Sequence, residues 1–179
     1  EGFAPNIELC RETLVPLGIR FEPADGSDPL PFDDDAFDVI TNRHGSYDVS
    51  EIRRTLKPGG VFITQQVGAE NDLELIELLM GRADVAFPEA YLDKATAAFE
   101  NHGFHIVQSM ETHRPIEFYD VGALVWYARI IEWEFPGFSV ETHRDNLLKA
   151  QALLEREGRL RGSIHRYYFV ARKHDGVES

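Results

Sequence analysis

The stretch LPFDDDAFDVITNRHGSYDVSEIRRTLKPGGVFITQQVG, residues 30–68, determines how the chain is expected to fold. It contains two short apolar runs, 37–41 and 61–64, with an amphipathic segment between them. The pattern predicts a strand, a helix over 49–56, a turn at the Lys-Pro-Gly-Gly sequence 57–60, and a second strand. Because parallel neighbours need a connection that crosses the sheet, we expect the two strands to pair in parallel through this helix.

Polar side chains follow both predicted strands. Asn42, Arg43 and His44 come directly after the first strand, and Gln65 and Gln66 follow the second. In open parallel sheets, ligands bind beyond the carboxyl ends of the strands. The sequence therefore predicts a site at these two strand ends.

Length and charge limit the classes of partner. A chain of 179 residues can bury a core, so a single domain over residues 1–179 is expected. Its 31 acidic and 18 basic residues give a net charge of −13, which repels nucleic acid and anionic membrane surfaces. We therefore expect neither of them as a partner.

Cysteine usage and hydropathy indicate the compartment. The single Cys10 excludes an internal disulfide and a zinc site built from cysteines, which suits a reducing environment. The sequence shows no signal peptide and no apolar run long enough to cross a bilayer. A cytoplasmic location is the resulting expectation.

The N-terminal part adds a helix, a strand and an acidic loop. Residues 5–18 have helical spacing of apolar side chains, and IRFEP, 19–23, reads as a short strand. The strand leads to Asp25 and Gly26, a carboxylate and a backbone N–H that could reach a ligand together, although Asp-Gly is also a common turn. The acidic run 33–35 lacks the alternating spacing of calcium ligands, so a solvated loop is expected there.

The C-terminal part supplies further helices and strands and one aromatic segment. The segment 115–138 concentrates Phe, Tyr and Trp and lies in a predicted helical insertion, 115–160, between the last two strands. Its aromatic side chains either complete the core or cap a binding pocket, and both interpretations remain open. Helices are expected over 72–80, started by Asn71 or Asp72, and over 89–101 and 140–157. Strands are expected at 103–107 and at 164–172, where His165, Tyr167, Phe169 and Ala171 alternate with the residues of the other face.

The LPF loop, the FDVI strand and the LKPGG turn together resemble the second half of a class I S-adenosylmethionine-dependent methyltransferase of the type 11 group. The resemblance is clearest over residues 1–68. It implies an α/β, Rossmann-like methyltransferase fold with a mostly parallel sheet, strand order 3-2-1-4-5-7-6 and an antiparallel last strand. It also implies S-adenosylmethionine as the cofactor and methyl transfer to a small-molecule acceptor.

The resemblance assigns residues to the nucleoside part of the cofactor. Glu1 and Gly2 match the end of the family's second strand, where an acid binds the ribose hydroxyls. Asp25 and Gly26 match the carboxylate and backbone N–H that contact the adenine. A carboxylate suits the ribose because its two oxygens can accept from two neighbouring hydroxyls.

The resemblance also assigns residues to the methionine part and to the acceptor. Asn42 and Arg43 match the segment that passes along the methionine part of the cofactor. His44 is the expected catalytic base where the acceptor must lose a proton, because imidazole titrates near neutral pH. The expected substrate contacts are Gln66, Tyr119 and Trp126.

One departure from the family concerns the beginning of the sheet. The family's first strand, most of its second and its glycine-rich turn should precede Glu1, and the sequence lacks them. In the family, the first two strands lie between the third and the fourth, so 19–23 and 37–41 would lack a neighbour. Either the sequence is a fragment of a longer enzyme, which we favour, or a second copy fills the gap in a homodimer.

Two other functions are weighed against methyl transfer. A non-catalytic Rossmann-like module could use the aromatic segment as a dimerisation or regulatory surface. A nicotinamide-dependent dehydrogenase is disfavoured because no glycine fingerprint is present and the LPF and LKPGG features would be unexplained. No metal is expected, since His102, His105 and His113 are too scattered to converge as ligands.

Overall fold

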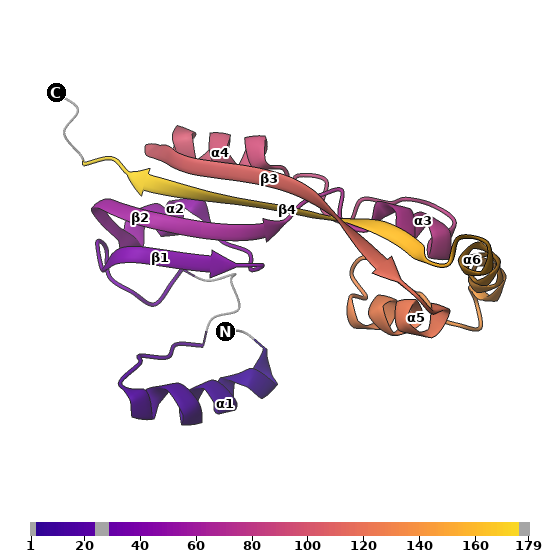
Figure 1. Ribbon diagram of the computed structural model, residues 1–179. Helices are drawn as coiled ribbons and strands as arrows, with labels where there is room; N and C mark the ends of the chain where they lie inside the picture. The colour runs from indigo at the N-terminus through magenta and orange to yellow at the C-terminus, as the bar shows by residue number, and fades with distance from the viewer. Residues whose placement is uncertain (1–2, 24–28, 176–179) are drawn as a thin grey trace. The chain divides into compact units, whose positions relative to one another are not determined.

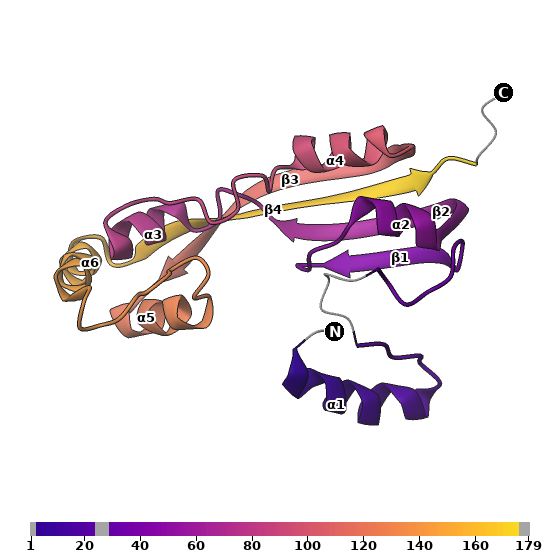
Figure 2. The same ribbon diagram turned by 180° about the vertical axis from the view of Figure 1, so that it is seen from behind.

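The computed structural model describes residues 3–23 and 29–175 (Figures 1 and 2). No helix of these residues is both long and apolar enough to cross a membrane. In chain order the elements are α1 (Ala4–Leu14), the 3-10 helix η1 (Val15–Leu17), β1 (Phe37–Arg43), α2 (Val49–Thr55), β2 (Leu56–Val67), α3 (Leu73–Met80), α4 (Leu92–Asn101), β3 (Phe104–Phe118), α5 (Val121–Ile130), α6 (Arg144–Glu157) and β4 (Leu160–Lys173).

The strands form one sheet with the order β1-β2-β4-β3. This order reproduces the last four strands, 4-5-7-6, of the predicted methyltransferase sheet. β1 and β2 run in the same direction, whereas β4 runs against both of its neighbours (Figure 1). The α/β class and the antiparallel last strand are therefore confirmed. The described sheet is mostly antiparallel, not mostly parallel as predicted, because the antiparallel strand takes part in two of its three pairings.

The predicted strand–helix–strand unit is confirmed. Asp48 begins α2, and its Oδ1 atom accepts from the backbone N–H groups of Ser50 at 2.7 Å and Glu51 at 3.1 Å. The helix ends at Thr55, and the Lys-Pro-Gly-Gly sequence predicted to be a turn belongs instead to β2. A Cβ atom at Gly60 would lie 2.8 Å from the Lys57 carbonyl oxygen, so the tight entry into β2 requires glycine.

The chain divides into two compact units, and aromatic rings form the core of the first. This unit comprises Glu1–Thr64, Thr96–Gln108 and Phe169–Ser179. Phe62 and Phe99 stack with ring centroids 5.0 Å apart. Phe104 and Phe169 contact the Phe99 ring edge-on at 4.9 and 5.0 Å. The unit thereby joins α4 to the strands that carry these rings.

Aliphatic side chains dominate the core of the second unit, which comprises Gln65–Ala95 and Ser109–Tyr168. Helices α3, α5 and α6 supply most of this core, and Phe135 and Leu160 complete it. The side chain of Asn146 on α6 donates to the carbonyl of Leu79 on α3 at 2.9 Å. The buried members are Leu75, Ile76, Leu79, Leu124, Ala128, Phe135, Ala150 and Leu160.

The predicted strand at 19–23 is wrong. These residues have neither helical nor strand structure, and no strand of the described chain pairs with them. The physical reason is that a strand exists only through hydrogen bonds to a neighbour. The segment is held instead by Arg20, which donates to the Pro31 carbonyl at 3.0 Å and covers the Phe32 ring at 5.0 Å.

The predicted N-terminal helix is confirmed as α1 and η1, which end at Gly18 in the left-handed region. None of its residues is buried, so the expected apolar side contributes little to a core. Cys10, expected to be a small core residue, is only half-buried. Within the described residues, no other element covers this apolar side completely.

The last two strands are longer than predicted. β3 continues to Phe118, well beyond the apolar run 103–107, because its polar second half pairs with β4. The predicted alternation in β4 is confirmed, since His165, Tyr167, Phe169 and Ala171 are all buried. In the sequence, helices α5 and α6 come between β3 and β4, and residues 115–118 of the predicted insertion belong to β3.

Candidate functional site

β1 and β2 are neighbours in the sheet, and within the first unit Asn42 of β1 lies beside Thr64 of β2, where the sequence predicts a site. Asn42 is the second-to-last residue of β1 and is half-buried, and Thr64 lies buried near the end of β2. The Thr64 hydroxyl donates to Asn42 Oδ1 at 3.2 Å. The second strand thus orients an amide group at the end of the first.

The two residues after Asn42 are exposed and change the direction of the chain. His44 has a φ of 55°, a left-handed conformation that His adopts more readily than most side chains. The following residues return to the core, where the Tyr47 ring contacts Phe62 at 5.3 Å between centroids. Arg43 therefore ends β1 and His44 begins the turn that follows. The Tyr47 ring fixes the other end of this turn to the core.

Helix α2 holds the LPF loop that precedes β1. Arg54 donates to the carbonyl oxygens of Leu30 at 3.0 Å and Phe32 at 2.8 Å. Glu51 accepts from the Leu30 backbone N–H at 2.8 Å and from Arg54. The Arg54 guanidinium and then the Leu30 N–H lower the pKa of Glu51 to about 2. The loop is therefore tied to the helix that connects the two strands of the site.

The acidic run 33–35 is exposed, as predicted for a solvated loop. Asp34 pairs with Arg54 at 2.9 Å, and Asp35 pairs with Lys173 at 2.8 Å. These carboxylates therefore have cationic side chains as partners, and they tie the loop to α2 and β4.

Four predicted cofactor contacts cannot be placed. Glu1, Gly2, Asp25 and Gly26 lie outside the described residues 3–23 and 29–175. Their assignment to the ribose and the adenine stays a prediction.

The predicted substrate contacts all belong to the second compact unit. Gln66 is half-buried near the end of β2. Tyr119 is 67% exposed and donates its hydroxyl to Glu117 at 2.7 Å. Trp126 on α5 is 68% exposed. Of the aromatic segment, Phe135 is the fully buried ring that completes the core.

Sequence reasoning missed a buried polar cluster in the second unit. Asp72 and Glu134 are both buried, and Asn71 Nδ2 donates to Asp72 Oδ2 at 2.8 Å and to Glu134 Oε1 at 2.9 Å. The Tyr127 hydroxyl donates to Asp72 Oδ2 at 2.7 Å, and the Arg166 guanidinium donates to Asn71 Oδ1. Asn71 and Asp72 were expected only to begin a helix. Asp72 does precede α3, but its carboxylate makes no capping bond to it.

Both carboxyl groups of the cluster have raised pKa values. Burial raises the pKa of Asp72. Burial and the nearby Asp72 carboxylate raise the pKa of Glu134 to about 7. Burial and the hydrogen bond to Asp72 also raise the pKa of the Tyr127 hydroxyl. Among the described residues, Asp72 Oδ1 is a buried side-chain atom without a hydrogen-bond donor, and protonated Glu134 supplies a donor beside it.

A family comparison bears on the first of these sites. Residues 3–64 match the family described as "Methyltransferase domain". The matched range includes the LPF loop, β1, α2 and the pair Asn42 and Thr64. No curated protein sequence matches the chain.

Solved structures share the fold. A candidate methyltransferase from Bacillus halodurans superimposes with a TM-score of 0.61 at 14% identity, over 97% of this chain and 80% of that one. The YcgJ protein from Bacillus subtilis gives a TM-score of 0.60 at 17% identity, over 98% of this chain and 81% of that one. A candidate sarcosine dimethylglycine methyltransferase from Galdieria sulphuraria gives 0.50 at 17% identity, over 95% and 65%.

At these identities the structural likeness establishes the fold and leaves the reaction open. The resemblance predicted from the LPF, FDVI and LKPGG features is confirmed by the family match and by the shared fold. Residues 3–64 match the methyltransferase domain family, and the chain shares the fold of these solved structures.

Proposed function

We propose that the chain forms part of an S-adenosylmethionine-dependent methyltransferase that acts on a small-molecule acceptor. The observation that carries the proposal is the edge formed by Asn42 and Thr64, which lies within the residues matched to the methyltransferase domain. Ligands of such sheets bind beyond the carboxyl ends of the strands, where this pair is found.

The residues at this edge fit the methionine end of the cofactor. That end carries a carboxylate and an ammonium group. The Arg43 guanidinium suits the carboxylate because it offers charged donors in a planar fork, and the Asn42 amide offers both a donor and an acceptor. Thr64 fixes the Asn42 side chain before any ligand arrives, which lowers the entropy lost on binding.

The protein's part in the reaction is alignment and proton removal. When bound, S-adenosylmethionine would supply an electrophilic methyl group: an oxygen, nitrogen, sulfur or carbon atom of the acceptor bonds to the methyl carbon in line, the bond from that carbon to sulfur breaks, and S-adenosylhomocysteine leaves. Catalysis of this kind depends mainly on holding the two reactants at the correct distance and angle. Where the acceptor loses a proton, the exposed imidazole of His44 accepts it.

Calorimetric titration tests which cofactor the protein binds. The full gene product that contains this chain should bind S-adenosylmethionine and not NAD, and Asn42→Ala should weaken binding. Thr41→Ala, which changes an exposed neighbour on the same strand, is the matched control. Binding of NAD alone, or of neither compound, would contradict the proposal.

The non-catalytic module remains a second candidate because of one observation. Trp126 and Ile130 lie one helical turn apart on α5 and are 68% and 50% exposed, and Trp133 beyond the helix is 58% exposed. A homodimer formed through this surface would be lost in Trp126→Ala, as measured by light scattering. The same protein would then fail to bind S-adenosylmethionine in the titration above.

A further inference from the structure

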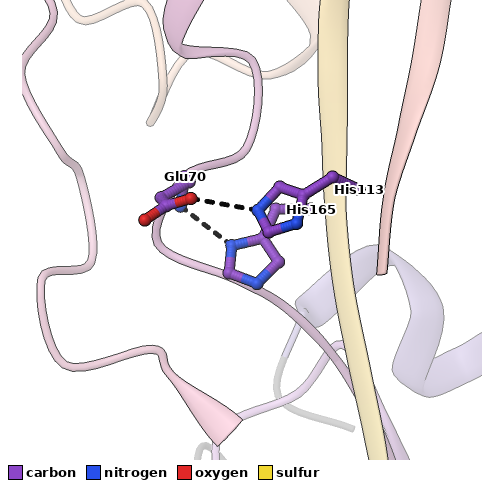
Figure 3. Close-up of side chains that lie close together, drawn as sticks. All are labelled: Glu70, His113 and His165. Carbon is purple, nitrogen blue, oxygen red and sulfur yellow. Dashed lines mark hydrogen bonds and ion pairs between the residues drawn. The ribbon is translucent and has the colours of Figure 1, made fainter. Parts of the chain in front are cut away.

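Two histidines and two glutamates come together in the second compact unit. Glu111 and His113 lie two residues apart on β3 and therefore share one face of the sheet. His165 lies on β4, the neighbour of β3. Glu70 follows β2, and Figure 3 shows its carboxylate beside the imidazole rings of His113 and His165.

Hydrogen bonds fix the tautomer of His165. The backbone N–H of Glu70 donates to His165 Nδ1 at 3.1 Å, so Nδ1 carries a lone pair and the ring proton is on Nε2. Nε2 lies 2.9 Å from Glu111 Oε1 and donates to it. Metal-binding histidines commonly have this arrangement, a neutral ring whose N–H is fixed by a carboxylate.

Packing fixes the orientation of the same ring. The His165 side chain is 1% exposed. It lies against the backbone of Gly68, where an added Cβ atom would approach the ring to 2.2 Å. The backbone N–H of Gly68 also donates to the His165 carbonyl at 3.0 Å. His165 is therefore a rigid member of the cluster.

Glu70 and His113 form the accessible side of the cluster. His113 Nε2 lies 3.0 Å from Glu70 Oε2, and its ring stacks on His165 with centroids 4.2 Å apart. Both side chains are nearly half exposed. An ion from solvent can thus reach the ligand atoms without opening the core.

We propose that Glu70, His113 and His165 bind one divalent transition-metal ion. One oxygen and two nitrogen atoms, one from each residue, all lie within 4.8 Å of one another. Around a four-coordinate ion with bonds of about 2.0–2.1 Å, neighbouring ligand atoms are roughly 3.3 Å apart. The exposed side chains of Glu70 and His113 supply the remaining shift of about 1.5 Å, while His165 stays in place.

The ligand types select the class of ion. Two imidazoles and one carboxylate suit Zn²⁺, Co²⁺, Ni²⁺ and Fe²⁺, whereas Mg²⁺ and Ca²⁺ prefer oxygen ligands alone. The net charge of −13 also favours cations near the surface. From the sequence, His113 was excluded as a metal ligand together with His102 and His105. Its partner His165 lies on another strand, far away in the sequence.

Metal binding would replace one hydrogen bond. The lone pair of His165 Nδ1 cannot accept from the Glu70 N–H and bind an ion at the same time. The Glu70 amide must therefore turn to solvent when the ion binds. Its NMR resonance should move far more than that of an amide in α4, which gives a readout besides affinity.

Calorimetric titration of the protein with Zn²⁺ tests the site. We expect one ion per chain, and a Co²⁺ complex with the strong visible absorption of a four-coordinate ion. His113→Ala and Glu70→Gln should each weaken Zn²⁺ binding at least tenfold, and Glu111→Gln, which alters the group that holds Nε2, by roughly tenfold. His105→Ala, an exposed histidine of the same strand, should bind as the unchanged protein does.

These variants avoid the buried His165, whose replacement could unfold the protein. Absence of Zn²⁺ binding at millimolar concentration would overturn the proposal. So would binding that survives both His113→Ala and Glu70→Gln, or binding that His105→Ala weakens equally. The result is independent of methyl transfer, because none of these residues is assigned to the methyl-transfer site.

Discussion

Asn71 and Glu134 meet through a single amide nitrogen, since Asn71 Nδ2 lies 2.9 Å from Glu134 Oε1 and 3.0 Å from Oε2. The same nitrogen donates to Asp72, so one amide group serves two buried carboxyl groups. The carboxylates of Asp72 and Glu134, which share this one amide group, would repel each other in a buried environment if both were charged. Burial and then the Asp72 carboxylate raise the pKa of Glu134 to about 7, so the pair holds a proton to a higher pH than an exposed glutamate does.

Replacing Glu134 by Gln should make the protein more stable at alkaline pH. The unfolded chain releases the Glu134 proton near pH 4.5 and the folded chain near pH 7. The folded state thus binds more protons between these values, and stability falls as the pH rises through them. A shift of this size corresponds to about 3 kcal/mol, so Glu134→Gln should exceed the unchanged protein by up to about that amount at pH 8 and match it near pH 4.

Urea unfolding at each pH measures this difference. Glu77→Gln, which removes an exposed carboxylate on α3 of the same unit, is the control and should show no such trend. A pH-independent difference between Glu134→Gln and the unchanged protein would show that Glu134 ionises normally.

Replacing Gly68 by Ala should destabilise the protein and abolish the proposed metal site together. The new methyl group would lie 2.2 Å from the His165 ring, which is buried and has no space to retreat. Overpacking of this kind costs about 1–3 kcal/mol. Gly158→Ala is the matched control, because nothing lies within 4 Å of its added Cβ atom and its cost is backbone strain at a φ of 76°. Gly68→Ala should therefore unfold at a lower temperature than Gly158→Ala. It should also bind no Zn²⁺, whereas Gly158→Ala should bind Zn²⁺ as the unchanged protein does.

Replacing Glu51 by Gln should lower the free energy of unfolding at neutral pH. This loss should shrink as the pH falls below about 4.5. Arg54 and the Leu30 N–H hold the pKa of Glu51 at about 2 in the folded protein. The stability from this carboxylate is therefore present above the unfolded value of 4.5 and is lost as the pH falls towards 2. Unfolding curves of Glu51→Gln and the unchanged protein should differ at pH 7 and converge in acid. Glu100→Gln changes an exposed carboxylate on α4 and is the control. Its unfolding curves should match those of the unchanged protein both at pH 7 and in acid.

Local patterns were sufficient to predict the strand–helix–strand unit of residues 37–64. Its apolar runs, its Asp48 cap and its glycines act over a few residues, so one sequence contains the whole signal. The segment 19–23 has an equally good local pattern and forms no strand, because pairing depends on a neighbour that periodicity cannot reveal.

The polar clusters of the second unit could not be predicted for the same reason. Asn71 and Glu134 are 63 positions apart, and Glu70 and His165 are 95 apart. The pairing of β2 with β4 brings Glu70 to His165, and the packing of α5 and Phe135 against α3 brings Glu134 to Asn71. The alternation of β4 did predict that His165 shares the face of Phe169, which was the one available signal that this histidine is buried.

Replacing Thr64 by Val should weaken both folding and cofactor binding. Valine keeps the shape of threonine in the buried strand but removes the hydroxyl that donates to Asn42. One lost hydrogen bond costs about 1 kcal/mol of stability. If Asn42 contacts the cofactor, loss of the hydrogen bond from Thr64 that orients its side chain should raise the Kd for S-adenosylmethionine severalfold, as calorimetry would show. Thr41→Val on the exposed face of β1 should leave both quantities unchanged, and an unchanged Kd in Thr64→Val would remove Asn42 from the cofactor site.

Replacing His44 by Asn should separate proton removal from cofactor binding. Asn tolerates the left-handed backbone at this position, where φ is 55°, but cannot take a proton near neutral pH. Loss of a catalytic base lowers turnover by about 10²–10⁴-fold, so kcat of the full gene product should fall by that order while the Kd for S-adenosylmethionine stays constant. Since displacement itself needs only alignment, an acceptor that carries no proton to lose should be methylated at the same rate by both proteins. An unchanged kcat with every acceptor would show that His44 takes no part in the reaction.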